Sequence, residues 1–336
     1  MRRFIPIVLV ALLTLTGTAA TQQVNLLCSP SLAWCEALGP AFNEATGYDL
    51  EFVRLSSSES LARLRAEAGN PNFDVWFGGT GDPHLVAFNE GLTEFYEPEL
   101  WDQILPNLRN AVGRTYIPLY TGAIGFVVNE GVLEEEGLDV PREWNDLRDP
   151  GYKGLLAMPN PNTSGTAYTI IATLVQIYGE AEAFEILADM HQNMAQYTRS
   201  GGAVGQLAGR GDVAVAVQFL HDGVAYAKQG YPVTNIAPAD GTGYEIGGLS
   251  LVAGAPHPEA AKAFIDWALT VEAQTLAADE GESYQVQSNQ NTPVPPESPV
   301  LEDINLIDYD FATYGDPEVR DELVSRWTNE IFPVPR

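Results

Sequence analysis

Four short polar turns hold the side chains of this sequence that are best suited to binding an oxyanion. Each turn combines hydroxyl groups with backbone N–H groups where a helix is predicted to begin. Such groups donate hydrogen bonds to phosphate or carboxylate oxygens, and the positive end of the helix dipole favours the negative charge. The turns are Ser29–Ser31, Ser56–Ser58, Gly78–Thr80 and Thr163–Thr166.

The turn Thr163–Thr166 has the most favourable composition of the four. Its glycine, Gly165, lets the backbone approach a bound group closely, and an apolar helix follows it. A similar helix start is predicted at Ser200–Gly202, with Arg199 beside it. A single turn of this kind is more often an ordinary helix cap or turn, so the prediction depends on the convergence of turns from both lobes. The predicted binding residues from these turns are Ser29, Ser57, Gly79, Thr80, Thr163, Ser164, Gly165 and Thr166.

A second group of candidate residues follows a predicted buried strand at Val213–Phe219. His221 and Asp222 come directly after this strand, and Glu245 stands at the start of another strand. Carboxylates accept two hydrogen bonds each from sugar-type hydroxyls, and a histidine donates to a hydroxyl or a phosphate. We expect these three residues in the same site as the polar turns. The alternative is that His221 and Asp222 only cap the strand and the next helix.

The elements that position these residues alternate between strand and helix in the first part of the chain. Such alternation predicts an α/β fold with a parallel sheet covered by helices. The strand expected at Tyr116–Asn129 would cross into a second lobe, and Glu245–Val252 would return. We also expect one long amphipathic helix over Pro258–Glu280. The predicted strands and helices of the first part are Val24–Leu27, Leu32–Glu44, Tyr48–Leu55, Ser56 to about Ala68, and Phe73–Phe77.

Two crossings between lobes divide the chain into discontinuous halves. The first lobe is predicted to contain residues 21–115 and 250–285. The second is predicted to contain residues 116–249 and 286–336. Two crossing strands form a hinge, so the site is expected between the lobes, beyond the carboxyl ends of the strands.

The first residues are typical of a secretory signal peptide. Arg2 and Arg3 precede an apolar run from Phe4 to Leu15, and small residues follow as far as Ala20. The run is short for a bilayer span. We therefore predict a signal peptide at residues 1–20 and a periplasmic or otherwise extracytoplasmic protein.

The two cysteines and the charge agree with export. Cys28 and Cys35 form an even pair seven positions apart, which in an exported protein predicts a disulfide. Two free thiols or a metal pair are the alternatives. The chain has 45 acidic and 17 basic residues and a net charge of −28. Such a field repels nucleic acids and anionic membrane surfaces, so we expect neither as a partner.

Several motifs together resemble an extracellular solute-binding family that includes ferric-iron binders and binders of phosphorylated solutes. The resemblance covers nearly the whole chain after the predicted signal peptide. It implies a type II periplasmic-binding-protein fold, two lobes that close on a ligand, and delivery to a membrane permease with its ATPase. We expect a monomer without a cofactor. The motifs are Cys28-Ser29-Pro30, Trp34-Cys35, 73–79 (FDVWFGG), 160–168 (NPNTSGTAY), 219–223 (FLHDG) and 241–247 (GTGYEIG).

Within this family the sequence is more similar to binders of hexose phosphates. Ferric binders of the group carry adjacent tyrosines after the strand that corresponds to Val213–Phe219, where this chain has Leu220-His221-Asp222. The favoured ligand is therefore a small anionic organic solute, phosphorylated or with a phosphonate group. A ferric-iron or other metal binder is the alternative, with possible donors at Asp82, His84, His221, Asp222 and Glu245.

An enzyme is the third possibility, and the motifs do not favour it. Ser29 or Ser164 could combine with His221 and an acid. However, the sequence has no Gly-x-Ser-x-Gly turn, no phosphate-binding loop ending in Gly-Lys, and no His-Glu-x-x-His. We therefore predict a binding protein without catalytic activity.

Overall fold

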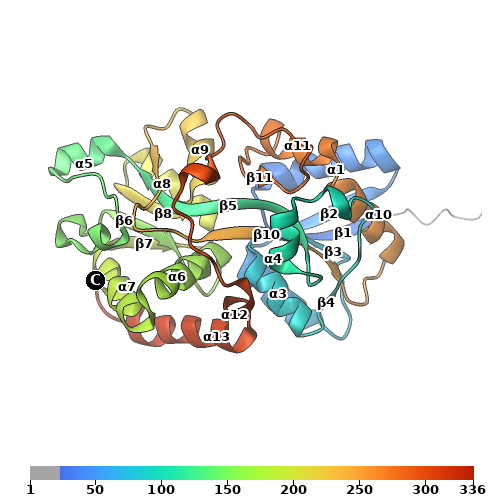
Figure 1. Cartoon of the computed structure of the whole chain (residues 1–336), viewed down its shortest axis with the longest axis horizontal. Coiled ribbons are helices and arrows are strands. Elements are labelled where there is room, and N and C mark those ends of the chain that lie inside the picture. Colours follow the sequence, from blue (N-terminus) through green and yellow to red (C-terminus); the bar gives the residue numbers. More distant parts are fainter. Residues whose placement is uncertain (1–22) are drawn as a thin grey trace, which may run out of the picture.

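The computed structural model describes residues 23–336, so the predicted signal peptide at 1–20 lies outside the described residues. Figure 1 shows an elongated molecule with two α/β halves joined by long strands. The strands are β1 (Gln23–Cys28), β2 (Asp49–Arg54), β3 (Val75–Phe77), β4 (Thr93–Glu94), β5 (Ile117–Val128), β6 (Leu156–Pro159), β7 (Met194–Thr198), β8 (Val215–Phe219), β9 (Thr234–Ile236), β10 (Tyr244–Val252) and β11 (Val286–Gln287).

The α-helices cover both faces of these strands (Figure 1). They are α1 (Leu32–Thr46), α2 (Ser57–Glu67), α3 (Gly81–Asn89), α4 (Pro106–Val112), α5 (Glu130–Glu136), α6 (Gly165–Tyr178), α7 (Glu180–Asn193), α8 (Gly205–Arg210), α9 (Leu220–Lys228), α10 (Pro258–Ala268), α11 (Val271–Asp279), α12 (Phe311–Tyr314) and α13 (Pro317–Arg326). Shorter helical turns are η1 (Trp101–Gln103), η2 (Trp144–Arg148), η3 (Pro150–Tyr152), η4 (Gly201–Ala203), η5 (Leu301–Asp303) and η6 (Trp327–Ile331).

The strands lie in the order β2-β1-β3-β10-β5-β8-β6-β7, with β4, β9 and β11 paired at the side. Strand β1 is parallel to β2 and β3, and β6 is parallel to β7 and β8. The α/β fold with parallel strands in each half is therefore confirmed. Strands β5 and β10 run antiparallel to their neighbours because they connect the halves.

Strand β5 belongs to both halves of the molecule. Residues 117–123 pair with β10, and residues 124–128 pair with β8. All twelve residues of β5 are buried. We call the half built on β1–β4 the first lobe and the half built on β6–β9 the second lobe. The predicted crossing strands, outward on β5 and back on β10, are confirmed.

Each lobe has large side chains at its centre. In the first lobe, Trp34 packs edge-on against Phe77, with 5.2 Å between ring centroids, and Phe42 packs similarly against Phe264. In the second lobe, Phe126 of β5 packs against Trp144 at 5.1 Å. Such buried aromatic pairs add packing energy to the apolar area that they remove from water. The crossing strand β5 is thereby fixed within the core of the second lobe.

The prediction of one long helix over Pro258–Glu280 is wrong. The pattern over Pro258–Glu280 suggested a single helix, but the structure has two, α10 and α11. Thr270 separates them because its hydroxyl accepts a hydrogen bond from the backbone N–H of Ala273 at 3.2 Å, which caps a new helix. The two helices continue the same apolar pattern, so sequence periodicity alone did not reveal the break.

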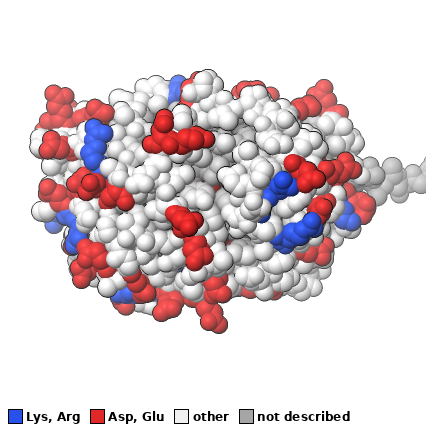
Figure 2. Space-filling view, in the orientation of Figure 1, with Lys and Arg blue, Asp and Glu red and all other residues white. Residues whose placement is uncertain are grey.

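The disulfide prediction is confirmed. Cys28 at the end of β1 and Cys35 in α1 are bonded, and their Cα atoms are 6.1 Å apart. No helix within residues 23–336 is long and apolar enough to cross a membrane. The face in Figure 2 carries acidic side chains over both lobes and far fewer basic ones, in line with the net charge. The exact residue limits of the lobes, as given above, stay a prediction.

Candidate functional site

A polar pocket lies between the two lobes, where the paired strands β5 and β10 pass from one lobe to the other. Its volume is about 270 Å³, which is room for one small solute. It takes residues from β2, the starts of α2, α3, α6 and α9, the turn η4, and strand β10. Its lining residues are Ser29–Leu32, Arg54, Ser56, Ser57, Gly79, Thr80, Tyr120, Ser164–Thr166, Ser200–Gly202, Phe219, His221, Asp222, Ala225, Tyr226, Gln229, Glu245, Glu282 and Gln285.

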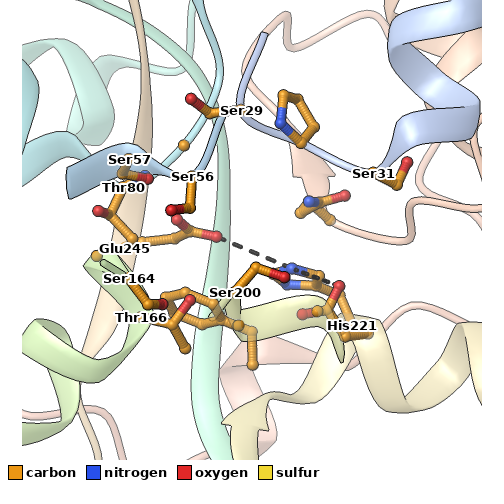
Figure 3. A pocket seen from close by; sticks show the side chains of 18 of the residues that line it. Ser29, Ser31, Ser56, Ser57, Thr80, Ser164, Thr166, Ser200, His221 and Glu245 are labelled. Carbon is orange, nitrogen blue, oxygen red and sulfur yellow. Dashed lines mark hydrogen bonds and ion pairs between the residues drawn. The ribbon is translucent and has the colours of Figure 1, made fainter. Parts of the chain in front are cut away.

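Ten of the eleven predicted binding residues line this pocket, and Thr163 does not. Figure 3 shows the labelled serines and threonines of both lobes around one space, with Glu245 among them and His221 across from it. The Thr163 hydroxyl donates instead to the carbonyl oxygen of Arg199 at 2.7 Å. Residues that are far apart in sequence are therefore brought to one place, as the polar turns suggested.

The first-lobe turn at Gly78–Thr80 depends on glycine. Gly79 has φ +90°, and a Cβ there would be 2.5 Å from the Ser57 hydroxyl. Only glycine adopts this conformation without strain while leaving the serine in place. The turn thereby brings the start of α2 against the start of α3.

The amides of this turn are engaged within the protein, contrary to the prediction of free N–H groups. The N–H of Gly79 donates to the Tyr120 hydroxyl at 2.7 Å, and that of Thr80 donates to the Ser57 hydroxyl at 3.1 Å. Sequence could not reveal this because Tyr120 comes from the middle of β5. The Thr80 hydroxyl, by contrast, is buried and has no partner. This hydroxyl is available to a ligand.

The second-lobe side of the pocket is the start of α6. Ser164 precedes this helix, is 1% exposed, and its side chain makes no capping bond. The first-turn N–H groups of a helix have no acceptor within the helix, and Gly165 and Thr166 are the first residues of α6. A Cβ on Gly165 would be 1.9 Å from the Thr80 hydroxyl oxygen. The absence of a side chain therefore lets the two lobes meet at this point.

His221 lies in the first turn of α9, stacked on Phe219 with 5.2 Å between ring centroids. Gly122 of β5 makes room for it, because a Cβ there would be 2.4 Å from Nδ1. Nε2 lies 3.7 Å from an oxygen of Asp222 and 3.9 Å from one of Glu245. Burial lowers the pKa of His221 to about 3, so the imidazole is neutral at neutral pH.

The two carboxyl groups beside His221 have raised pKa values. Burial raises the pKa of Asp222 to about 7, although Arg54 opposes the shift. Burial also raises the pKa of Glu245 well above its usual value, and the neighbouring carboxylates of Asp222 and Asp82 add to this. A pair of partly protonated carboxyl groups can both donate to and accept from the hydroxyls of a solute.

Arg54 is a charged residue of the pocket lining that the sequence analysis missed. It ends β2, and its guanidinium donates to the carbonyl oxygens of Pro30 at 3.1 Å and Ser29 at 3.4 Å. Burial lowers its pKa, and the carboxylate of Asp222 opposes that shift most strongly. Its place at the carboxyl end of a strand, directly before the Ser56–Ser58 turn, was the signal that could have identified it.

The donors proposed for the metal alternative do not all reach the pocket. His84 and Asp82 are absent from its lining, and His84 bonds instead to Ser250 at 2.8 Å and to the carbonyl oxygen of Gly78 at 3.0 Å. Among residues 23–336, no three His, Cys, Asp or Glu side chains are arranged to hold a metal ion. His84 also stacks on Trp76, so its role here is packing.

Two α/β lobes joined by crossing strands around a polar pocket define the solute-binding class of proteins, which hold a ligand between their lobes. The chain belongs to the bacterial extracellular solute-binding protein family, whose model matches residues 30–275. It is thus a solute-binding protein of an ABC importer, as the family resemblance predicted. Its partners are accordingly a small-molecule ligand and the transporter.

Related proteins support this assignment. A protein of Haemophilus influenzae is 39% identical over 328 residues, which cover 96% of this chain and 95% of that protein. The periplasmic binding protein AfuA from Actinobacillus pleuropneumoniae, solved with fructose-6-phosphate bound, is 38% identical with a TM-score of 0.90, covering 92% of this chain and 98% of that one. A putative 2-aminoethylphosphonate-binding periplasmic protein of Salmonella typhi is 27% identical over 257 residues, covering 74% and 72%.

Proposed function

We propose that this protein captures a small phosphorylated organic solute, such as a sugar phosphate or a phosphonate, and delivers it to an ABC permease. The carrying observation is that two kinds of polar groups line one pocket. The first kind, which we call the oxyanion part, consists of hydroxyls and helix starts together with Arg54, and these groups suit an oxyanion. The second kind consists of His221, Asp222 and Glu245, which suit hydroxyl groups.

The residues of the oxyanion part come from both lobes. Ser57 and Thr80 belong to the first lobe, while Ser164, Gly165 and Thr166 belong to the second. A phosphate has enough acceptor oxygens to bond to both sets at once. The ligand thereby favours the closed arrangement, because only that arrangement satisfies all of its oxygens. The bound fructose-6-phosphate of AfuA supports this choice of ligand.

The ferric-iron alternative has weaker support in the pocket. Two tyrosines, Tyr120 and Tyr226, line it and could be considered as phenolate ligands. Burial raises the pKa of each above the usual value for a phenol. The Tyr226 hydroxyl also donates to the carbonyl oxygen of Gly202 at 2.5 Å. Both phenols are therefore held protonated, which is unfavourable for binding Fe³⁺.

The finer parts of the proposal concern location and activity. We infer an extracytoplasmic monomer, exported by a signal peptide at residues 1–20, which binds its ligand without changing it. A serine hydrolase would need a base hydrogen-bonded to its serine and oriented from behind. His221 has no hydrogen bond at Nδ1 and no serine partner among the contacts of the described chain.

A thermal-shift screen followed by calorimetry tests the proposal. The probes are fructose-6-phosphate, glycerol phosphate, 2-aminoethylphosphonate and ferric citrate, with fructose and inorganic phosphate as controls. A ligand at 100 times its Kd stabilises the folded protein by about 2.7 kcal/mol, which is easily detected. We expect at least one phosphorylated or phosphonate probe to raise the Tm more than either control.

The outcomes separate the alternatives. A Tm increase with ferric citrate alone, together with visible absorbance of the loaded protein, would replace the proposal by iron binding. Release of inorganic phosphate from the sugar phosphate during incubation would contradict binding without catalysis.

A further inference from the structure

One arginine of the C-terminal helix is buried between the lobes, behind the pocket. Arg320 lies on α13, which packs on α6 and continues into η6 beside α7 of the second lobe (Figure 1). Only 5% of its surface is exposed. It does not line the pocket and plays no part in the function described so far.

Arg320 lies close to the first turns of three helices that form the pocket. Its Nη2 donates to the hydroxyl of Ser58 in α2 at 2.7 Å. Its guanidinium carbon lies 4.9 Å from the ring centroid of Tyr168 in α6. Asp82 in the first turn of α3 is near enough for its carboxylate to oppose the effect of burial on the pKa of Arg320. Helix α2 starts at the pocket residue Ser57, α3 starts directly after the pocket residue Thr80, and α6 starts at the pocket residues Gly165 and Thr166.

The bond between Arg320 and Ser58 joins the two lobes. Another interlobe pair, Arg199 with Glu59, involves an arginine side chain that is 76% exposed. Exposed ion pairs contribute little, typically below about 1 kcal/mol, because water screens them and both side chains lose freedom. The bond between Arg320 and Ser58 is buried and is not screened in this way, and hydrogen bonds to charged groups contribute about 1.5–3 kcal/mol. Of the two contacts, the buried one is therefore expected to resist separation of the lobes more strongly.

From this geometry we infer that Arg320 is a positioning residue for ligand retention: it holds the starts of α2, α3 and α6 together in the closed form without touching the ligand. This inference rests on the proposed function, since it concerns release of the solute from the same pocket. Opening the lobes breaks the Ser58 bond and separates Arg320 from Asp82. Arg320 thus slows opening, and its effect falls on the dissociation rate rather than on the association rate.

The test measures association and dissociation rates of fructose-6-phosphate by stopped-flow fluorescence, with the other phosphorylated probes as substitutes if they bind more tightly. We expect Arg320→Met to raise the dissociation rate about tenfold or more, and to change the association rate by less than about threefold. Ser58→Ala removes the other partner of the bond and keeps the arginine, so it should raise the dissociation rate in the same direction.

Arg326→Met is the matched control. Arg326 is on the same helix and lies 4.0 Å from the ring centroid of Phe184, but its ion partners, Glu180 and Glu330, belong to the second lobe and the C-terminal segment. Its loss should leave both rates unchanged. In the double variant Arg320→Met/Ser58→Ala, the increases should be non-additive, because both substitutions remove one bond.

The possible results distinguish the inference from the proposed function. If the parent protein binds none of the phosphorylated probes, the proposed function fails and this inference fails with it. If the parent binds but Ser58→Ala and Arg320→Met both dissociate at the parent rate, only the role of Arg320 is overturned. An unfolded Arg320→Met leaves Ser58→Ala to decide. Equal effects of Arg326→Met and Arg320→Met would show a general loss of helix packing instead.

Discussion

At the scale of single residues, the pocket combines buried groups whose pKa values are shifted in opposite directions. Burial lowers the pKa of His221 and raises that of Asp222. Both shifts favour the neutral form, which is the form that a partly dehydrated site tolerates. An empty pocket at neutral pH therefore carries less charge than its residue types suggest. Arg54 remains the cation that can meet an anionic ligand.

The Asp222 shift predicts a pH dependence of stability. The folded pKa of about 7 lies above the usual 3.8, so the contribution of Asp222 is present in full below about pH 4 and is lost as the pH rises through 7. Asp222→Asn removes this loss. We expect the variant to become more stable relative to the parent between pH 4.5 and pH 8. The measurement is the difference in unfolding free energy, variant minus parent, from urea titrations at each pH.

The control for this titration is Gly69→Ala, which changes no titratable group and has no atom within 4 Å of its added Cβ. Its difference from the parent should stay constant over the same pH range. Parallel curves for Asp222→Asn and the parent would show that the Asp222 carboxyl is not perturbed by burial.

A second residue-scale prediction concerns the start of α6. Ser164→Ala removes a buried hydroxyl that lines the pocket and caps no helix N–H, so the ligand is its expected partner. We expect affinity for a phosphorylated probe to fall by about 1–3 kcal/mol in calorimetry. Thr163→Ala is the control, since its hydroxyl bonds to Arg199 outside the pocket. Equal affinity of Ser164→Ala and the parent would exclude Ser164 from binding.

At the scale of elements, the pocket is an arrangement of helix starts held by crossing strands. The starts of α2 and α3 belong to the first lobe and that of α6 to the second, and they meet because Gly165 has no side chain. The first N–H groups of α6 have no partner within the helix, and the Thr80 hydroxyl before α3 is also unpartnered, so an anion placed between them bonds to both lobes. The close approach at Gly165 therefore links ligand binding to contact between the lobes.

Gly165→Ala tests that link. The added Cβ would lie 1.9 Å from the Thr80 hydroxyl oxygen and 3.0 Å from the Ser57 Cβ, both in the other lobe. Opening of the lobes relieves the overlap, so we expect weaker ligand binding by about 1–3 kcal/mol with little change in Tm of the free protein. Gly69→Ala, with no atom within 4 Å of its added Cβ, should bind as the parent does. A large loss of Tm in Gly165→Ala would contradict this account.

At the scale of the whole molecule, two strands carry the connection between lobes that otherwise have separate cores. Strand β5 is buried along its full length and pairs with both sheets, while β10 returns beside it. Bending of these strands changes the distance between the lobes without disrupting either core. Figure 2 shows acidic side chains on both lobes. Two arginines lie between the lobes: Arg320 is buried, and Arg54, which lines the pocket, is partly buried.

Small-angle X-ray scattering tests closure in solution. We expect the radius of gyration to decrease when a saturating phosphorylated probe is added to the parent, because the ligand bonds to both lobes. The same addition should compact Gly165→Ala less. An identical radius with and without a ligand that calorimetry shows to be bound would contradict closure.

The sequence alone predicted the alternating α/β elements, the crossing strands, the disulfide and ten of the residues that line the pocket. Local chemistry determined these features. Polar turns follow apolar strands at Gly78–Thr80 and Thr163–Thr166, and the carboxyl ends of parallel strands lie at one edge of a sheet. The residues of one turn are neighbours in sequence, so the sequence alone shows that polar residues gather at the edge of the sheet where a ligand could bind.

Only the tertiary structure decided which members of each turn face the pocket and which partners they have. The Thr163 hydroxyl donates to the carbonyl oxygen of Arg199, and the Tyr120 hydroxyl accepts from the N–H of Gly79. Arg54, at the end of β2, lines the pocket. These contacts join residues that are far apart in the chain. The direction of a side chain at the cleft depends on how the two lobes pack against each other. Local sequence patterns do not determine that packing, because it depends on contacts between distant parts of the chain.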